Sequence, residues 1–331
     1  MRKTVIWLII GLALGGSIPA SAATKSTTPA TKYRYATNRA PYYMKSTSTY
    51  YRSVWTSARQ AWTKSKAFTW TQKKSAATKS YTTTVSKTSG IWASATGIAY
   101  VGKSFDQNGA QTGAGMYLNR AILNKYKYTK KQRINVATHE MGHALGLNHN
   151  AVGSVSVMNP TNRRHTIAAC DTRGVKAVYK TPLTAKLTTL TAAAKPEMVV
   201  DHNTDYNGQS GLTALKKAAP VIVEGEVVKS VSHHKAPKNY YTTQTLTVDH
   251  AFKGKIGKTI TFTQAGTTSM AVADSEILHK GEEVLVMLAK DPAGHYYAIN
   301  DGQGLFIETD HAAHLFEHVS DHAMYKESAL H

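Results

Sequence analysis

The sequence has almost no cysteine and few long apolar runs. Among its 331 residues the single cysteine is Cys170. One cysteine excludes an internal disulfide, and it excludes the zinc modules that need several thiolate ligands. The one long apolar run, Val5 to Leu14, is shorter than the roughly 20 residues that cross a bilayer as a helix. We therefore expect a protein that does not span a membrane.

The beginning of the chain is typical of a cleaved secretory signal. Arg2 and Lys3 form a short basic start, the apolar run follows, and Ala20-Ser21-Ala22 supplies the small residues that signal peptidase requires. We expect residues 1–22 to be a signal peptide and the mature protein to be secreted. Secretion without disulfides favours a bacterial exported protein.

Acidic residues are scarce in the first half of the chain. Residues 23–180 contain 25 Lys and Arg but only three acids, a net charge of +22, whereas residues 181–331 contain 13 against 17, a net of −4. A positive field of this size attracts polyanions. For a secreted chain we expect the anionic polymers of a bacterial cell wall, and not nucleic acid, as that partner. The alternative is that the charge serves solubility alone.

The pattern along the chain divides it into segments. We expect a flexible leader over residues 23–40, a first domain over 41–180, a linker over 181–214, a small all-β domain over 215–309 and a His-rich tail over 310–331. In the first domain, apolar spacing predicts helices over 43–64, 130–147 and 170–179, and strands over 68–81, 91–101 and 113–118. Six period-2 strands after Val221 predict a small antiparallel barrel or sandwich.

The stretch "THEMGHALGLNHN", residues 138–150, has the spacing of a metal site. Residues four apart on a helix share one face, so His139 and His143 point at one place. Glu140 then reaches beside the metal, where a general base takes a proton from water. Gly146 permits a sharp turn that returns His149 as a third ligand. Three nitrogen ligands leave one position open for water, as in catalytic zinc sites.

With "SVMNP" after it, the extended motif resembles the metzincin zinc endopeptidases, and within them a bacterial, matrixin-type peptidase. "VMNP" and "CDTRGVKAVY" carry the narrower resemblance, which covers roughly residues 40–180. It implies an α+β, metzincin-type catalytic domain with a twisted mixed sheet and three main helices. It also implies that His139, His143 and His149 bind Zn²⁺, that Glu140 is the catalytic base and proton donor, and that Met158 forms an apolar floor under the ligands.

Some positions depart from the matrixin pattern. No cysteine precedes the domain, so latency by a propeptide cysteine is unsupported, and Cys170 is expected to be a buried thiol. Asn150 and Asn159 stand where matrixins usually have serine and tyrosine. Because Asp106 is the only acid in residues 23–138, we expect no calcium requirement of the catalytic domain. Residues 113–119 are our candidate for the exposed strand edge that pairs with substrate, and an ordinary interior strand is the alternative.

These features predict a secreted zinc metalloendopeptidase, extracellular or associated with the cell wall, which hydrolyses protein or peptide substrates. The alternative is a wall-binding adhesion protein in which proteolysis is secondary, and a third interpretation is cleavage of peptide cross-links in the wall itself. Four histidines recur near the C-terminus, and on a helix they would share one face and could bind a second metal ion: His311, His314, His318 and His322. We favour a solvated tail there, because no turn fixes their geometry.

Overall fold

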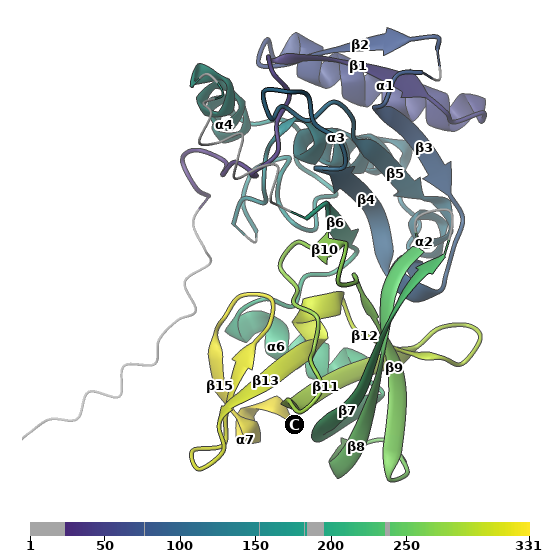
Figure 1. The fold of residues 1–331 in the computed structure, drawn as a ribbon. Helices are drawn as coiled ribbons and strands as arrows, with labels where there is room; N and C mark the ends of the chain where they lie inside the picture. Colours follow the sequence, from purple (N-terminus) through teal and green to yellow (C-terminus); the bar gives the residue numbers. More distant parts are fainter. Residues whose placement is uncertain (1–23, 76, 152, 182, 184–194, 236–238) are drawn as a thin grey trace, which may run out of the picture.

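A computed structural model describes residues 24–331, apart from 76, 152, 182, 184–194 and 236–238 (Figure 1). The predicted signal peptide lies outside the described residues. The described chain forms two sheets, one built mainly from the N-terminal half with its covering helices and one built from the C-terminal half. No helix within the described part of the chain combines the length and the apolar character that a membrane span requires.

The first sheet has seven strands in the order β10-β6-β4-β5-β3-β1-β2. Their bounds are β1 (Arg39–Met44), β2 (Thr69–Lys73), β3 (Tyr81–Val85), β4 (Ala95–Val101), β5 (Gly115–Asn119), β6 (Glu197–His202) and β10 (Ala271–Val272). β1 pairs in parallel with β2 and β3, and β3 pairs in parallel with β5. β4 is antiparallel to both of its neighbours, β5 and β6. This arrangement confirms the predicted mixed sheet.

Three long helices accompany this sheet, as predicted: α1 (Thr49–Lys64), α3 (Lys130–Leu145) and α4 (Ala169–Lys180). A short helix α2 (Arg120–Lys125) and a 3₁₀ turn η1 (Gly90–Trp92) were not predicted. The ends of α3 follow from local chemistry. Thr129 and Gln132 form a reciprocal capping box at its start, and Gly146 stops it by adopting a left-handed φ of 116°.

Strand β5 contains most of the segment that we predicted as the substrate-binding edge, and that prediction is wrong. It lies inside the sheet, paired with β3 on one side and β4 on the other. All five of its residues are buried. A strand with both edges paired has no backbone groups free for a peptide.

The second sheet confirms the predicted small β-barrel. Its strands are β7 (Val221–Lys235), β8 (Asn239–Lys253), β9 (Thr259–Ala265), β11 (Glu283–Lys290), β12 (Tyr296–Ala298), β13 (Leu305–Asp310), β14 (Leu315–His318) and β15 (Met324–Lys326). The first five close on themselves, because β12 pairs with both β9 and β11. Apolar residues at alternate positions, such as Val223, Phe262 and Val286, fill the interior.

Three segments differ from our expectations. The described part of the leader, from residue 24, is packed: Tyr33 is fully buried, and the Thr28 and Thr31 amides donate to the Cys170 and Gly146 carbonyls. The predicted linker contains β6 and the start of α6 (Gln209–Ala218). The tail forms β14, β15 and α7 (Glu327–Leu330) instead of remaining solvated. Contacts with distant parts of the chain order the leader and β6, whereas β14 pairs with its sequence neighbours β13 and β15.

Asp171 joins several parts of the first domain. This fully buried carboxylate accepts hydrogen bonds from the Thr28 and Ser156 hydroxyls at 2.7 and 2.5 Å. It also accepts from the backbone amides of Val157 and Ala168 at 3.0 and 2.8 Å. One side chain therefore fixes the N-terminal segment, the loop before Met158 and the start of α4.

We predict that Asp171→Ala lowers the free energy of unfolding by about 3 kcal/mol or more, because each buried donor left without an acceptor costs roughly 1–3 kcal/mol. Chemical denaturation measures the change. Asp249→Ala, at an exposed position on β8, is the control and should change stability by less than about 0.5 kcal/mol. Equal stability of the two variants would contradict the role given to Asp171.

Candidate metal centre

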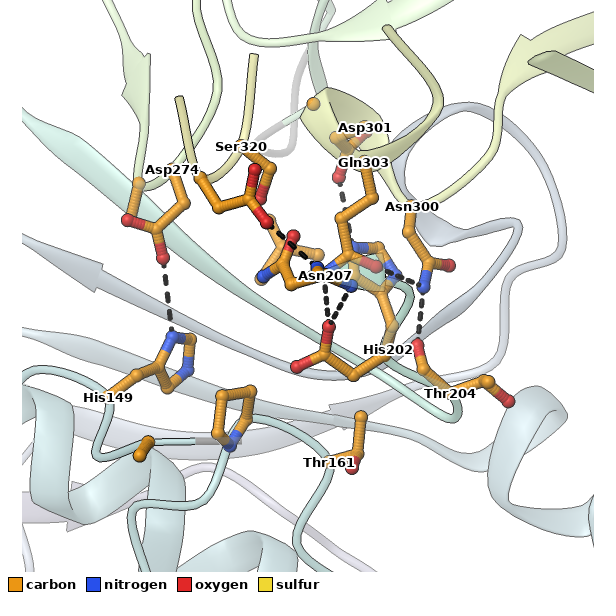
Figure 2. A pocket seen from close by; sticks show the side chains of 18 of the residues that line it. His149, Thr161, His202, Thr204, Asn207, Asp274, Asn300, Asp301, Gln303 and Ser320 are labelled. Atoms are coloured by element: carbon orange, nitrogen blue, oxygen red, sulfur yellow. Dashed lines mark hydrogen bonds and ion pairs between the residues drawn. The ribbon is translucent and has the colours of Figure 1, made fainter. Parts of the chain in front are cut away.

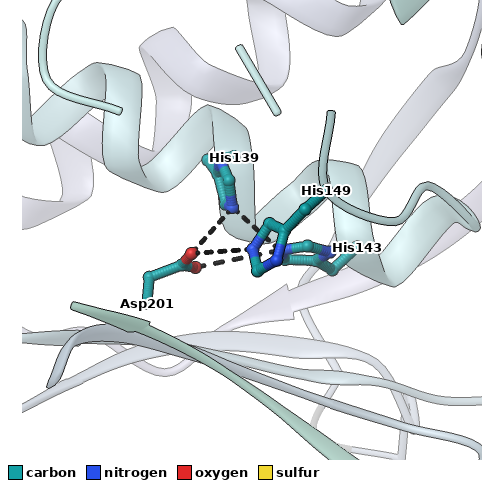
Figure 3. A group of neighbouring side chains, drawn as sticks. All are labelled: His139, His143, His149 and Asp201. Carbon is teal, nitrogen blue, oxygen red and sulfur yellow. Dashed lines mark hydrogen bonds and ion pairs between the residues drawn. The ribbon is translucent and has the colours of Figure 1, made fainter. Parts of the chain in front are cut away.

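The end of α3 brings two imidazoles to one place. His139 and His143 lie one turn apart, both are almost completely buried, and their Nε2 atoms are 2.8 Å apart (Figure 3). The helical spacing read from the sequence produces this approach, since positions i and i+4 share a face.

Backbone carbonyls fix the orientation of both rings. His139 Nδ1 donates to the Val157 carbonyl at 2.6 Å, and His143 Nδ1 donates to the Leu147 carbonyl at 2.9 Å. A carbonyl oxygen only accepts, so Nδ1 of each ring carries a hydrogen and Nε2 is the atom that faces the centre. Such hydrogen bonds are the usual supports of metal-binding histidines.

His149 joins the pair after the turn at Gly146. Its ring centroid is 5.3 Å from that of His139 and 4.8 Å from that of His143. The left-handed conformation of Gly146 reverses the chain direction there, as predicted. The structure thus brings together the three histidines that the sequence predicted as ligands.

A fourth group, Asp201, was missed by the sequence analysis. It lies on β6, and its Oδ1 is 2.9 Å from His139 Nε2 and 3.1 Å from His149 Nε2 (Figure 3). Its other oxygen, Oδ2, is 3.8 Å from His143 Nε2. The apolar run from Met198 to Val200 could have indicated a strand. Nothing in the sequence indicated that this strand pairs with β4.

Glu140 is buried beside this cluster. Its carboxyl lies over Gly97 of β4, so closely that a Cβ added to Gly97 would be 1.8 Å from Glu140 Oε1. Neither carboxyl oxygen has a hydrogen-bond partner of ordinary geometry among the described residues. The carboxyl is nevertheless close enough to Asp201 for that carboxylate to raise the pKa of Glu140. Glu140 therefore adjoins the centre without being one of the converging groups.

Burial and the neighbouring charges together set the ionisation of the cluster. Burial, reinforced by Asp201, raises the pKa of Glu140 well above its usual range. Burial lowers the pKa of His143 well below normal, and the adjacent imidazoles lower it further. For His149 burial also lowers the pKa, but hydrogen bonds to Asp201 and Asp274 outweigh it and raise the pKa to about 10. Burial opposes ionisation of Asp201, yet the surrounding imidazoles hold its pKa well below the usual value.

Met158 lies where an apolar floor was predicted. It is fully buried, and its sulfur is against Gly142, between His139 and His143 on α3: a Cβ on Gly142 would be 2.3 Å from Met158 Sδ. Its carbonyl accepts the Asn150 amide at 2.8 Å. Met158 therefore supports the helix under the imidazoles and the chain just after His149.

The donor set fits a zinc ion. Ligand atoms of His139, His143, His149 and Asp201 all lie within 4.8 Å of one another. In a tetrahedral site with bonds of about 2.0–2.2 Å, ligand atoms are about 3.3–3.6 Å apart, so small adjustments would complete the geometry. Imidazole nitrogens and a carboxylate oxygen are ordinary zinc ligands. The residues present could therefore hold Zn²⁺.

A cavity of about 920 Å³ opens next to the centre, between the two halves of the chain (Figure 2). His149 lines it on one side, and Asp274 contacts the His149 Nδ1 atom at 3.5 Å. Residues from the C-terminal half line the opposite side, including Asn300, Asp301 and Gln303. The C-terminal half therefore forms part of the surroundings of the metal centre.

The C-terminal histidines do not share a helix face. They lie on β14 and in the loops around it, and each makes an ion pair or hydrogen bond with an acid: His311 with Glu308, His314 with Glu327, His318 with Asp321 and His322 with Glu317. Within the described ranges, the group of His139, His143, His149 and Asp201 is the one set of such side chains with metal-ligand geometry. Cys170 is buried, as predicted.

Part of the chain is similar to known proteins. Residues 53–180 match the family model of the matrixin peptidases. The chain is also similar to the structure of high choriolytic enzyme 1, a hatching enzyme zinc-protease from the medaka fish Oryzias latipes. The identity is 17% and the TM-score 0.21, over 35% of this chain and 49% of that one, so the similarity spans about half of that protein. No curated protein matches the chain.

The matrixin match supports a metzincin-like zinc protease for this part of the chain. It also confirms zinc as the cofactor expected from the motif, since matrixins are zinc-dependent. The matched range begins within α1 and ends with α4. Asp201 therefore lies outside it.

We predict that the purified chain contains about one zinc ion and that His143→Ala loses most of it, because a missing ligand leaves fewer nitrogens to compete with water. Elemental analysis of folded samples measures the ratio. His279→Ala, an exposed position in the C-terminal half, should retain the wild-type zinc content. A His143→Ala variant that retained it too would show that the metal binds elsewhere.

Proposed function

We propose, from the matrixin match over residues 53–180, that this chain is a secreted zinc-dependent metalloendopeptidase that hydrolyses peptide bonds in proteins. The observation that carries the proposal is the convergence of three imidazole Nε2 atoms with a buried carboxyl, Glu140, beside them. Closed structural zinc sites have no need of a neighbouring acid that is not a ligand. Hydrolysis does need such an acid, because a proton must be taken from water and passed to the leaving amine.

When bound, zinc supplies Lewis acidity toward water and toward the peptide carbonyl. The chain's own residues do the rest. Glu140 accepts the proton of the attacking water and returns it to the nitrogen of the leaving amine. Val157 and Leu147 hold the two helical imidazoles through their carbonyls, so that these ligands do not rotate during the reaction. The buried setting keeps bulk water from competing with these contacts.

An extended peptide is the substrate that suits this site. Gly97 of β4 lies directly against the Glu140 carboxyl. A peptide paired with the edge of β4 opposite β5, in place of β6, would therefore pass in front of both Glu140 and the imidazoles. Backbone hydrogen bonds to a strand edge bind a peptide irrespective of its side chains. The proposed substrate is thus an unfolded or extended segment of a protein.

A second candidate function is suggested by charge. Residues 23–180 carry a net charge of +22, which favours association with an anionic cell-wall polymer after secretion. In that case wall binding is the main role and proteolysis is secondary. Wall peptide cross-links are a further candidate substrate of the same site. The two functions separate when the catalytic base is removed.

We predict that Glu140→Gln lowers kcat for peptide hydrolysis by about 10²–10⁴-fold, the usual contribution of a general base, while zinc content and folding persist. Glutamine keeps the size of the side chain but cannot accept the proton. Glu276→Gln, exposed in the C-terminal half, is the matched control. Undiminished hydrolysis by Glu140→Gln would exclude the proposed mechanism.

If the charge binds wall polymer, retention of the full chain on immobilised polyphosphate should weaken strongly between about 0.1 and 1 M salt, because the Debye length falls from about 10 to 3 Å. Chromatography with a salt gradient measures this. Glu140→Gln should be retained equally, since it leaves the surface unchanged. Salt-independent retention would rule out electrostatic binding.

A further inference from the structure

Strand β6 occupies the edge of the sheet nearest the metal centre. It pairs antiparallel with β4, from Val101↔Glu197 to Ala95↔His202, with one irregularity between Ala95 and Gly97. Figure 1 shows β6 alongside β4, on the side toward the C-terminal half. Of the other first-sheet strands only the two-residue β10 lies beyond it. Without β6, the edge of β4 would be open.

That edge is the one that a substrate would need. β4 carries Gly97, which lies directly against the Glu140 carboxyl. The opposite edge of β4 is already paired with β5. A peptide that hydrogen-bonds to this strand in front of the imidazoles must therefore take the position that β6 now holds.

The side-chain alternation of β6 places a carboxylate at the centre. Met198 and Val200 pack in the cluster that includes Met270 and Val272 of the C-terminal half, whereas Val199 packs in the core cluster of the first domain. Asp201 follows Val199 by two residues and so points to the same side, toward α3. In register it faces Gly97, and its carboxylate contacts all three imidazoles.

Contacts at both ends hold β6 in place. Glu197 makes an ion pair with Lys32 at 3.4 Å, and His202 makes one with Asp301 at 3.3 Å. Backbone amides of Ala271 and Ala273 donate to the Pro196 and Met198 carbonyls. The C-terminal half therefore fastens the strand from the side opposite α3.

We infer that residues 197–202 are a built-in pseudo-substrate: β6 fills the position of the substrate strand and Asp201 takes the fourth ligand position on the metal, so that the chain is latent until β6 is displaced. This inference rests on the proposed function. It requires no cysteine and places the inhibitory segment after the catalytic helices, not before them. Three His ligands with a carboxylate make a closed tetrahedral site, in which water has no position.

The first test measures access to the metal in the full chain, loaded with Co²⁺ and titrated with acetohydroxamate while the visible spectrum is followed. If the site is open in about a tenth or less of the wild-type molecules, its apparent affinity is about tenfold or more weaker than that of an open site. Asp201→Ala should therefore bind acetohydroxamate at least that much more tightly. Equal affinities in the wild type and Asp201→Ala overturn the inference.

Two further variants serve as an alternative and as a control for this test. Asp201→Asn keeps the size of the side chain, and because a neutral amide is a poor zinc ligand it should also open the site. It therefore replaces Asp201→Ala if that variant does not fold. Asp249→Ala, at an exposed position on β8, should behave as the wild type does.

Peptide turnover separates the inference from the proposed function. The expected result is faster cleavage of an unstructured peptide by Asp201→Ala than by the wild type. If both cleave equally fast, latency is excluded and the peptidase function stands. If acetohydroxamate gains access in Asp201→Ala but neither protein cleaves any peptide, the occupied ligand position stands and the peptidase function fails.

Hydrogen exchange tests the pairing of the strands directly. In the wild-type chain the amides of residues 97–101 should exchange as slowly as those of the interior strand β5, because both edges of β4 are paired. Fast exchange, as expected of an open sheet edge, would show that β6 does not occupy this position in solution and would overturn the inference.

Discussion

The site depends on two hydrogen bonds that the metal ligands make to the backbone. Val157 and Leu147 accept from the Nδ1 atoms of His139 and His143, which leaves both Nε2 atoms directed at one point. Val157 is in turn held in place by its backbone amide, which donates to buried Asp171. The positions of the ligands therefore depend on the packing of α4, which carries Asp171, and of the N-terminal segment, which contacts Asp171.

The features of the site that follow from short-range chemistry were predictable from sequence. His139, His143 and Glu140 share helix α3, and Gly146 ends that helix in the left-handed conformation that the motif requires. Met158 lies within twenty residues of all of them. Spacing alone positions such groups, because helical periodicity and one turn determine where their side chains point. The three main helices and the barrel strands were predictable for the same reason.

The contribution of Asp201 was not predictable, and the reason is physical. The three apolar residues of β6, Met198 to Val200, could have indicated a short strand, but they could not indicate where it lies. Its position depends on pairing with β4, about a hundred residues earlier, and on packing against the C-terminal half. The same reason explains why residues 113–119 were wrongly predicted to be an exposed edge. The local sequence does not tell an edge strand from an interior one, and only the strand order shows that β5 is interior. Long-range pairing decides what local propensity leaves open.

The most direct test of the central claim is X-ray absorption spectroscopy at the zinc edge of the full-length, zinc-loaded chain. We expect four nitrogen or oxygen ligands at about 2.0–2.2 Å, with the scattering signature of three imidazoles and no sulfur. Because one of the four is a carboxylate, the spectrum should change in Asp201→Ala. Fewer than three imidazoles around the metal would show that these histidines do not form the site, and a wild-type spectrum identical to that of Asp201→Ala would show that Asp201 is not a ligand.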